Sequence, residues 1–250
     1  MNVNDIICVG AEPLAMVDYL ALEKPRPRLV AEIMKGLQKG AREAGVAIVG
    51  GETAIVPDLV RGFDLSGTVV GIVKKDSIIT GEQAEPGDAV LGLASSGIHS
   101  NGLTLARKTL LVPRADPKII RELIRPTRIY VKEISRLLRS NLEIHGLAHI
   151  TGGAYSKLKR IGQRAKVGFQ LDNLPEPPWV FKTIQSRARV SEREMYRTFN
   201  MGIGFLVICP KQAARQARSL LPGFRQIGHV TSSRGVTVRA SGKEFSVIKY

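Results

Sequence analysis

Four short polar segments break the apolar stretches of this 250-residue chain, and they constrain its fold more than any other feature. They are VND at 3–5, GGET at 50–53, SSGIHSNG at 95–102 and HITGG at 149–153. Each follows or interrupts an apolar segment and carries small residues, so its backbone N–H groups can approach an anion closely. We expect these segments to be polar turns between regular elements.

Strand and helix patterns alternate along the chain without strict interleaving, which predicts an α+β fold. Apolar residues at helical spacing predict a helix over 26–45, ended by Gly45. The other expected helices lie within 101–111, 126–140, 144–162 (after a strand and a turn) and 211–221. The expected strands lie within 46–57 (short and buried, before a Gly-Gly turn), 63–79, 89–95, 144–150, 167–179 (before a Pro-rich loop), 200–210, 223–231 and 235–240.

The charge is divided unevenly and suggests two lobes. Up to Gln83 there are 9 Lys/Arg against 11 Asp/Glu, and from Ala84 onward there are 28 against 11, so the balance changes from −2 to +17. Turn residues cluster at the same point, within 74–88. We therefore predict an N-terminal lobe over 1–82 and a C-terminal lobe over 83–250.

A basic C-terminal lobe fits either a solvated surface or a polyanionic partner such as a nucleotide or a phosphorylated metabolite. Aromatic residues make up only 5% and do not interleave with the basic ones, so stacking platforms for nucleic acid are not indicated. Cys8 and Cys209 lie in apolar runs without a CxxC partner, which favours buried free thiols in a reducing compartment. Neither a membrane span nor a signal peptide is expected.

The chemistry of the four segments points to phosphate and a cation. SSGIHSNG leads into a helix, whose N-terminus would favour phosphate. Asp5 and Glu52 end apolar runs, where carboxylates often bind Mg²⁺ at nucleotide phosphates. Each feature also has an ordinary interpretation. GGET can be only a turn, His99 a structural histidine, Asp5 a helix cap, and Ser95, Ser96 and Asn101 N-cap residues.

The remaining histidines give weaker signals. His145 and His149 are four residues apart, but their segment reads as strand and turn, so a helical metal pair is rejected. His229 lies in a late strand with no visible partner in the sequence.

Six strings, in this order, make the chain similar to the phosphoribosylformylglycinamidine cyclo-ligase (AIR synthetase) family of purine biosynthesis. They are VNDIICVGAEPLAMVDYLA, VAIVGGETAIVPD, LASSGIHSNGLTLARKTL, RPTRIYVKEI, LAHITGGAYSKLKRI and EMYRTFNMGIGFLV. The wider superfamily, which includes selenophosphate synthetase and thiamine-phosphate kinase, shares SSGIHSNG and GGET. The strings PTRIYV and MYRTFNMGIG favour the cyclo-ligase.

The resemblance implies a cytoplasmic enzyme that uses ATP and Mg²⁺ to close the imidazole ring of formylglycinamidine ribonucleotide. It implies a homodimer in which the first lobes join sheets into a barrel, and a second lobe with an α/β layer. The family also carries an earlier segment with a DGVGTK-like stretch. We therefore expect this chain to be weak or inactive unless that part is supplied.

Site residues follow from the resemblance position by position. The implied nucleotide-binding residues are Asn4, Asp5, Gly50, Gly51, Glu52 and Thr53, of which Asp5 and Glu52 would hold the metal. The implied substrate-binding residues are Ser96, Gly97, His99, Ser100, Asn101, Thr151, Gly152 and Gly153. Asp5 and His99 are the implied catalytic residues, with His99 transferring a proton or polarising the amide oxygen.

Three other interpretations remain at this point. One is a sister ATP-dependent enzyme of the selenophosphate synthetase or thiamine-phosphate kinase type. Another is an inactive truncated remnant. The third is a nucleic-acid binder driven by the basic half, which predicts steeply salt-dependent binding.

Overall fold

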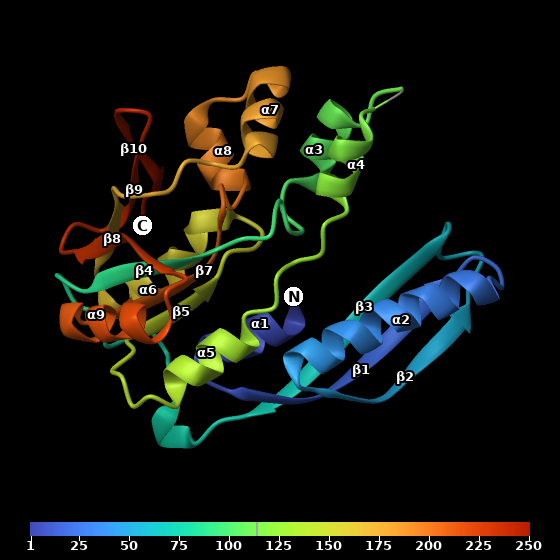
Figure 1. The fold of residues 1–250 in the computed structure, drawn as a ribbon, viewed down its shortest axis with the longest axis horizontal. Helices are drawn as coiled ribbons and strands as arrows, with labels where there is room; N and C mark the ends of the chain where they lie inside the picture. Colours follow the sequence, from blue (N-terminus) through green and yellow to red (C-terminus); the bar gives the residue numbers. More distant parts are fainter. Residues whose placement is uncertain (114) are drawn as a thin grey trace. The chain divides into compact units, whose positions relative to one another are not determined.

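The computed structural model describes residues 1–113 and 115–250. Its contacts divide the chain into two compact units. Unit 1 comprises Met1–Ile78 and Ile129–Ser135, and unit 2 comprises Ile79–Arg128 and Arg136–Tyr250. Each unit combines helices with its own β-sheet (Figure 1), so the predicted α+β class with two lobes is confirmed.

Unit 1 is built on a three-stranded sheet in the order β2-β1-β3. The central strand β1 pairs in parallel with β2 and antiparallel with β3. The bounds of its elements are α1 Asn2–Ile6, η1 Ile7–Val9, β1 Glu12–Leu22, α2 Pro27–Ala44, β2 Ala47–Ile55, β3 Phe63–Ile72 and η2 Lys75–Ser77.

Helix α2 forms as its sequence predicts. Proline occupies its first turn, where the missing N–H costs nothing, and Gly45 ends the helix in the left-handed conformation at φ 71°.

Two of the four predicted turns in the sequence are regular elements in unit 1. The segment VND belongs to helix α1, and GGET lies in the middle of strand β2. The strand prediction for 46–57 was also wrong about burial, because most of β2 is exposed. Gly51 is explained by packing: a Cβ there would come within 2.6 Å of both the carbonyl oxygen and Oδ1 of Asp18 on β1.

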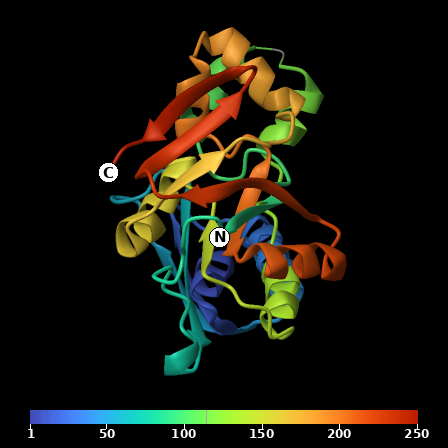
Figure 2. The same cartoon turned by 90° about the vertical axis from the view of Figure 1, so that its left-hand side faces the viewer.

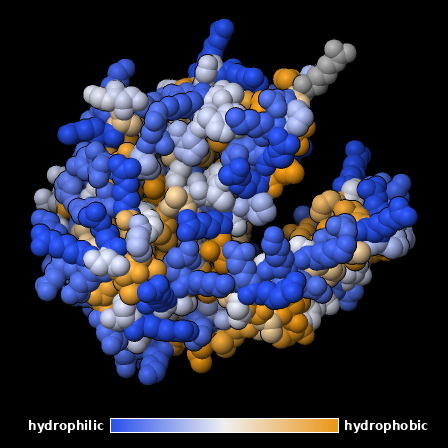
Figure 3. Space-filling model, viewed as in Figure 1, coloured by the Kyte–Doolittle hydropathy of each residue, from blue (hydrophilic) through white to orange (hydrophobic). Residues whose placement is uncertain are grey.

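The unit 1 sheet has one covered face and one open face. Leu20 and Leu22 of β1 are buried, whereas Val17 and Tyr19, which alternate with them, are each 42% exposed. Helix α1 contacts β3, and helix α2 contacts β2. Hydrophobic side chains are visible over the strands below α2 in the space-filling view (Figure 3).

Unit 2 is built on a seven-stranded sheet in the order β10-β9-β6-β8-β4-β7-β5. The C-terminal hairpin of β9 and β10 lies at one edge of this sheet (red in Figure 2). The strands are β4 Ala89–Ala94, β5 Gly146–His149, β6 Gly168–Leu171, β7 Ile203–Cys209, β8 Phe224–Thr231, β9 Gly235–Ala240 and β10 Lys243–Ile248. The helices are α3 Leu103–Leu110, α4 Pro117–Leu123, η3 Ala154–Lys157, α6 Leu158–Ala165, α7 Trp179–Ala188, α8 Glu192–Thr198 and α9 Lys211–Leu220, and α5 Val131–Leu138 contains residues of both units.

The strands predicted within 89–95, 144–150, 167–179, 200–210, 223–231 and 235–240 are all present. The helix predicted over 126–140 begins only at Val131. The first residues of the predicted helix bond to the 95–102 segment instead. The Pro126 carbonyl accepts a hydrogen bond from the Ser96 hydroxyl, and the Arg128 N–H donates to His99. The sequence patterns did not reveal β1, α4, α7, α8 or β10.

The core of unit 2 surrounds the central strands. Every residue of β7 is buried, and so are the first five residues of β4. Cys209 at the end of β7 and Cys8 in unit 1 are both buried, as predicted, and the Cys8 thiol donates to the Asn4 carbonyl at 3.2 Å. Among the described residues, no helix combines the length and the apolar character that crossing a bilayer requires.

Candidate functional site

Three loops meet at one end of the unit 2 sheet. Strands β4 and β5 are both antiparallel to β7, so the ends of β4 and β5 lie beside the beginning of β7. The loops that continue from these ends are 95–102, 150–154 and 200–202. Hydrogen bonds tie them together: the Ser95 N–H donates to the Gly202 carbonyl at 2.9 Å, and the Asn101 side chain donates to the Ile150 carbonyl at 3.4 Å.

Asn200 is the buried centre of this loop cluster. Its Nδ2 donates to the carbonyls of Gly97 at 2.9 Å and Ile98 at 3.0 Å. Its Oδ1 accepts the Ser95 hydroxyl at 2.9 Å and the Gly202 N–H at 2.8 Å. The side chain is 0% exposed and uses both of its donors and both acceptor positions. Asn200 therefore fixes the course of the 95–98 backbone.

A second support comes from the segment after α4. Arg125 donates to the Ser96 carbonyl at 3.0 Å and pairs with the buried carboxylate of Glu122 at 2.8 Å. Gly97 packs closely against this pair, since a Cβ there would lie 3.1 Å from Glu122 Oε1. Arg128 donates from its guanidinium to the Ala94 carbonyl at 2.9 Å. The loop is thus held from two sides.

His99 is buried in this loop in a left-handed backbone conformation, with φ at 60° and 5% exposure. Its Nε2 accepts the N–H of Ser96 at 3.1 Å and of Arg128 at 3.4 Å. Burial, and then the nearby His149 and Arg128, lower the pKa of His99 to about 4. His99 is therefore neutral at physiological pH, and because Nε2 accepts, its proton is on Nδ1.

The other predicted substrate residues divide by exposure. Ser100, Gly152 and Gly153 are exposed, whereas Gly97, Asn101 and Thr151 are buried. The Ser96 hydroxyl donates to the Pro126 carbonyl at 2.7 Å. Gly153 has φ at 81°, and a Cβ at Gly152 would meet no atom within 4 Å, so this turn leaves room for a ligand. Helix α3 is capped by Gly102 at φ 64°, with no side-chain cap, so Ser95, Ser96 and Asn101 are not N-cap residues.

The predicted nucleotide residues lie in unit 1. Asn4 is fully buried, and its Oδ1 accepts the Tyr130 N–H at 3.0 Å, so this side chain helps to build the fold. Asp5 on α1 and Glu52 on β2 are exposed carboxylates, and one Glu52 oxygen accepts the Thr53 N–H at 3.0 Å. Gly50 and Gly51 lie opposite Val17 and Asp18 of β1.

A closed protein metal centre is absent from the described ranges 1–113 and 115–250, where no group of three or more His, Cys, Asp or Glu could hold a metal. Asp5 lies on α1, which packs against β3, whereas Glu52 lies on β2 on the other side of β1.

The remaining histidines have partners in unit 2. His149 stacks against Phe205 with ring centroids 6.3 Å apart, and His229 lies 3.7 Å from Asp172. His145 contacts Asp88 and Glu143.

Sequence reasoning missed three supporting residues of the loop cluster: Arg125, Arg128 and Asn200. Each lies in a string that carried the family resemblance, RPTRIYVKEI or EMYRTFNMGIGFLV. For Asn200 the signal was a polar side chain just before an apolar strand, whereas Arg125 and Arg128 lie in an irregular segment between two helices. The backbone groups that these residues bind are about 30 or about 100 residues away in sequence.

Comparison with known proteins defines the class first. Residues 1–73 match the family described as AIR synthase related protein, N-terminal domain. Residues 85–241 match AIR synthase related protein, C-terminal domain. The two matches together cover most of both units.

Curated relatives then give the particular family. A phosphoribosylformylglycinamidine cyclo-ligase of Pyrococcus furiosus is 52% identical over 98% of this chain and 74% of its own length. The cyclo-ligase of Methanocaldococcus jannaschii is 48% identical over 100% of this chain and 75% of its own. The chain therefore belongs to the phosphoribosylformylglycinamidine cyclo-ligase family, as its sequence motifs predicted.

A solved structure agrees on the fold. The crystal structure of hydrogenase maturation protein HypE in complex with ATP has a TM-score of 0.80 and 22% identity. The match covers 100% of this chain and 77% of that protein. At this identity the likeness shows a common fold.

Proposed function

We propose that this protein is a ligase that closes the imidazole ring of aminoimidazole ribonucleotide in purine biosynthesis. The observation that carries this proposal is the 52% identity to a cyclo-ligase over 98% of the chain. The substrates are ATP and formylglycinamidine ribonucleotide, and the setting is the cytoplasm. The HypE structure with ATP on the same fold supports the choice of nucleotide.

The reaction joins two chemical steps. The formamide oxygen attacks the γ-phosphorus of ATP, so an O–P bond forms and ADP leaves. The amidine nitrogen then attacks the activated carbon, its proton is lost, and the C–O bond breaks as phosphate departs. The products are aminoimidazole ribonucleotide, ADP and phosphate. The protein contributes mainly by holding the reacting atoms together and stabilising developing charge.

His99 acts in this proposal as a neutral hydrogen-bond donor. A pKa of about 4 leaves no imidazolium at neutral pH. Its Nε2 is occupied by the backbone of Ser96 and Arg128, so proton abstraction through this atom would break two hydrogen bonds. The proton on Nδ1 is buried, so polarisation of the substrate amide oxygen would require the loop to open toward the substrate. Of the two roles considered for His99, polarisation is the one that leaves both hydrogen bonds to Nε2 intact.

The phosphate ends of the two substrates bind to different units. The turn at Thr151–Gly152–Gly153 has open space and a left-handed glycine, which suits the ribose phosphate of formylglycinamidine ribonucleotide. In unit 1, Asp5 on α1 and Glu52 on β2 are the proposed ligands of Mg²⁺ carried by ATP, with Gly50, Gly51 and Thr53 beside Glu52 on β2. The metal supplies charge neutralisation at the phosphates.

A homodimer through unit 1 belongs to the same proposal. The open face of its sheet exposes Val17, Tyr19, Val70 and Ile72, at 42 to 63%. A second copy of this chain would bury that face against its own equivalent. Light scattering should then report twice the chain mass, and Val70→Glu should reduce it to the monomer.

A direct assay tests the activity. The protein is incubated with ATP, Mg²⁺ and formylglycinamidine ribonucleotide, and both ADP and aminoimidazole ribonucleotide are measured. We expect equal amounts of the two products. ADP formation that ignores formylglycinamidine ribonucleotide and responds to another substrate would indicate a sister enzyme instead.

His99→Asn tests the site. Asparagine tolerates the left-handed backbone at this position but lacks the imidazole donor. We expect kcat to fall about 100-fold or more, and the melting temperature to fall as well because the N–H groups of Ser96 and Arg128 lose their acceptor. In the unchanged protein, kcat should show no loss due to His99 protonation until the pH approaches about 4. Normal turnover by the variant would rule out the chemical role of His99.

A further inference from the structure

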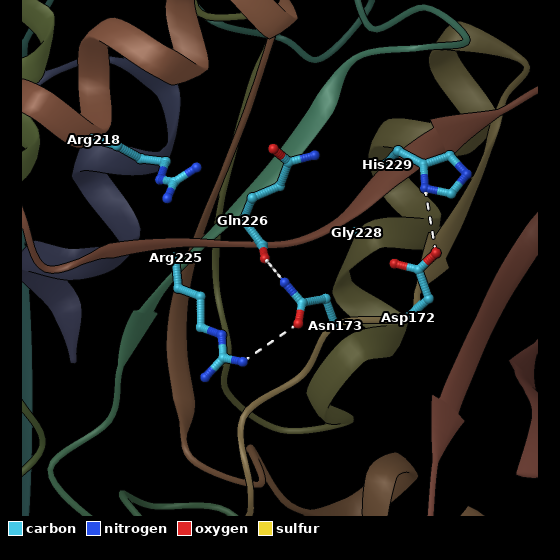
Figure 4. Close-up of a pocket in the computed structure, with 7 residues that line it drawn as sticks. All are labelled: Asp172, Asn173, Arg218, Arg225, Gln226, Gly228 and His229. Carbon is cyan, nitrogen blue, oxygen red and sulfur yellow. Dashed lines mark hydrogen bonds and ion pairs between the residues drawn. The ribbon is translucent and has the colours of Figure 1, made fainter. Parts of the chain in front are cut away.

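A hollow lies in unit 2, along strand β8. Its volume is about 300 Å³, and it is lined by Asp172, Asn173, Arg218, Arg225, Gln226, Gly228 and His229 (Figure 4). Arg218 comes from the last turn of α9, Asp172 and Asn173 follow β6, and the others belong to β8. None of these residues belongs to the loops 95–102, 150–154 and 200–202, so this hollow is separate from the candidate active site.

Two arginines give one side of this pocket its charge. Arg218 and Arg225 lie on the same side, and neither has a carboxylate partner among the described residues (Figure 4). Arg225 is held by one hydrogen bond, to Asn173 Oδ1 at 3.3 Å. Two positive charges on one side of a pocket make that side attractive to an anion. Arginine forks match the oxygens of phosphate in particular.

The opposite side of the pocket has different chemistry. Asp172, the single carboxylate among the described lining residues, pairs with His229 at 3.7 Å. It faces the pocket from the end away from the arginines (Figure 4). Asn173 in the middle donates to the Gln226 carbonyl at 2.7 Å, which fixes its amide between the two sides. A carboxylate and an imidazole are suitable partners for hydroxyl groups.

We propose that this pocket binds a phosphorylated sugar, with the phosphate on Arg218 and Arg225 and the sugar hydroxyls toward Asp172 and His229. The volume suits a ligand of this size, at the lower end of about 300–1,000 Å³ for small-molecule sites. A larger ligand such as a whole nucleotide finds no Phe, Tyr or Trp among the lining residues to stack its base. The site is distinct from the substrate sites of the ring-closing reaction.

The NMR signals of the individual histidines test the proposal, because they distinguish binding in this pocket from binding at the candidate active site. The chain has four histidines, of which His229 lies in this pocket and His99 in the candidate active site. Protein labelled with ¹³C-histidine is titrated with ribose 5-phosphate and, separately, with unphosphorylated ribose and inorganic phosphate. We expect saturable shifts of the His229 signal with ribose 5-phosphate, weaker ones with phosphate, and none with ribose.

Variants of the two pocket arginines test whether their side chains bind the phosphate. Arg218→Ala and Arg225→Ala should each weaken the His229 response about tenfold, because each removes a charge-assisted contact to phosphate. Arg215→Ala on the same helix is the control, since Arg215 is exposed and does not line the pocket. It should leave the affinity unchanged.

Three outcomes would overturn the proposal. The first is a response that appears only at His99 or His149. The second is equal affinity in Arg218→Ala, Arg225→Ala and the unchanged protein. The third is a loss of equal size in Arg215→Ala, which would indicate a general effect of net charge. An unchanged His145 signal in each variant verifies that it is folded, because His145 is buried between Asp88 and Glu143.

Discussion

The two units place their polar residues in opposite ways. In unit 2 the loop cluster is buried and irregular, and side chains such as Asn200 bond to distant backbone groups. In unit 1 the candidate nucleotide residues Asp5 and Glu52 are exposed on a helix and a strand. The unit 2 cluster is therefore a preorganised framework whose supports contribute to stability. The unit 1 carboxylates are exposed, so we expect a change at Glu52 to affect stability less than a change at Asn200.

The largest expected effect on stability is that of Asn200→Ala. It removes the partner of three buried backbone groups, in Gly97, Ile98 and Gly202, and of the half-buried Ser95 hydroxyl. We expect the free energy of unfolding to fall by about 2–4 kcal/mol, measured by urea denaturation, and kcat to fall with it. Asn173→Ala is the control, since that residue is exposed. If both variants are equally stable, Asn200 does not hold the loop.

Gly51→Ala has the next largest effect and tests the strand in unit 1. The new Cβ would meet two oxygen atoms of Asp18 at 2.6 Å, so we expect a loss of about 1–3 kcal/mol. Gly50→Ala is the matched control, because its Cβ would only reach Val17 at 4.0 Å. Thermal unfolding compares the two. An equal effect at both positions would contradict the packing explanation for Gly51.

Glu52→Gln should separate activity from stability. The side chain is exposed, so the melting temperature should not change. The KM for ATP should rise about tenfold if Glu52 contributes one ligand to a metal held mostly by phosphates and water. Glu43→Gln on α2 is the control, because Glu43 is also an exposed glutamate of unit 1. Equal kinetics in the two variants would remove Glu52 from the nucleotide site.

His145 gives the smallest effect, seen in the dependence of stability on pH. Burial lowers its pKa, but hydrogen bonds to Glu143 at 2.9 Å and Asp88 at 2.6 Å outweigh burial, so the pKa is raised. Its contribution to stability is therefore complete below its unfolded pKa of about 6.5 and is lost as the pH rises through the folded pKa.

Thermal unfolding at about pH 6 and about pH 8.5 tests this behaviour. The unchanged protein should lose more stability between these values than His145→Gln does. His229→Gln, a variant of a more exposed histidine, should behave like the unchanged protein. If all three proteins lose the same stability between the two pH values, the pair of His145 and Asp88 makes no pH-dependent contribution to stability.

Much of the fold followed from local pattern. Helix α2 and strands β4 and β7 could be predicted because their apolar spacing, caps and turns all lie within a few residues. The error at GGET arose because two adjacent glycines are typical of a turn. Here Gly51 lies within a strand, and its lack of a Cβ leaves room for Asp18 on the neighbouring strand. Sequence contains no direct measure of such a cross-strand contact.

The candidate site was partly predictable for the same reason. His99 and the turn at 151–153 lie in small-residue segments that are recognisable by themselves. The neutrality of His99 was not predictable, since it depends on burial and on His149, which is 50 positions further along the chain. The tautomer depends in turn on the N–H of Arg128, 29 residues away.

The position of Asn200 has a consequence for how the protein is made. Its partner Gly97 lies 103 residues earlier, so the 95–98 loop lacks its anchor while that part of the chain leaves the ribosome. The loop acquires its final shape only after the first residues of β7 have been synthesised and joined to β4. Competence to bind substrate thus arises only after Asn200 and the strand that follows it have been made.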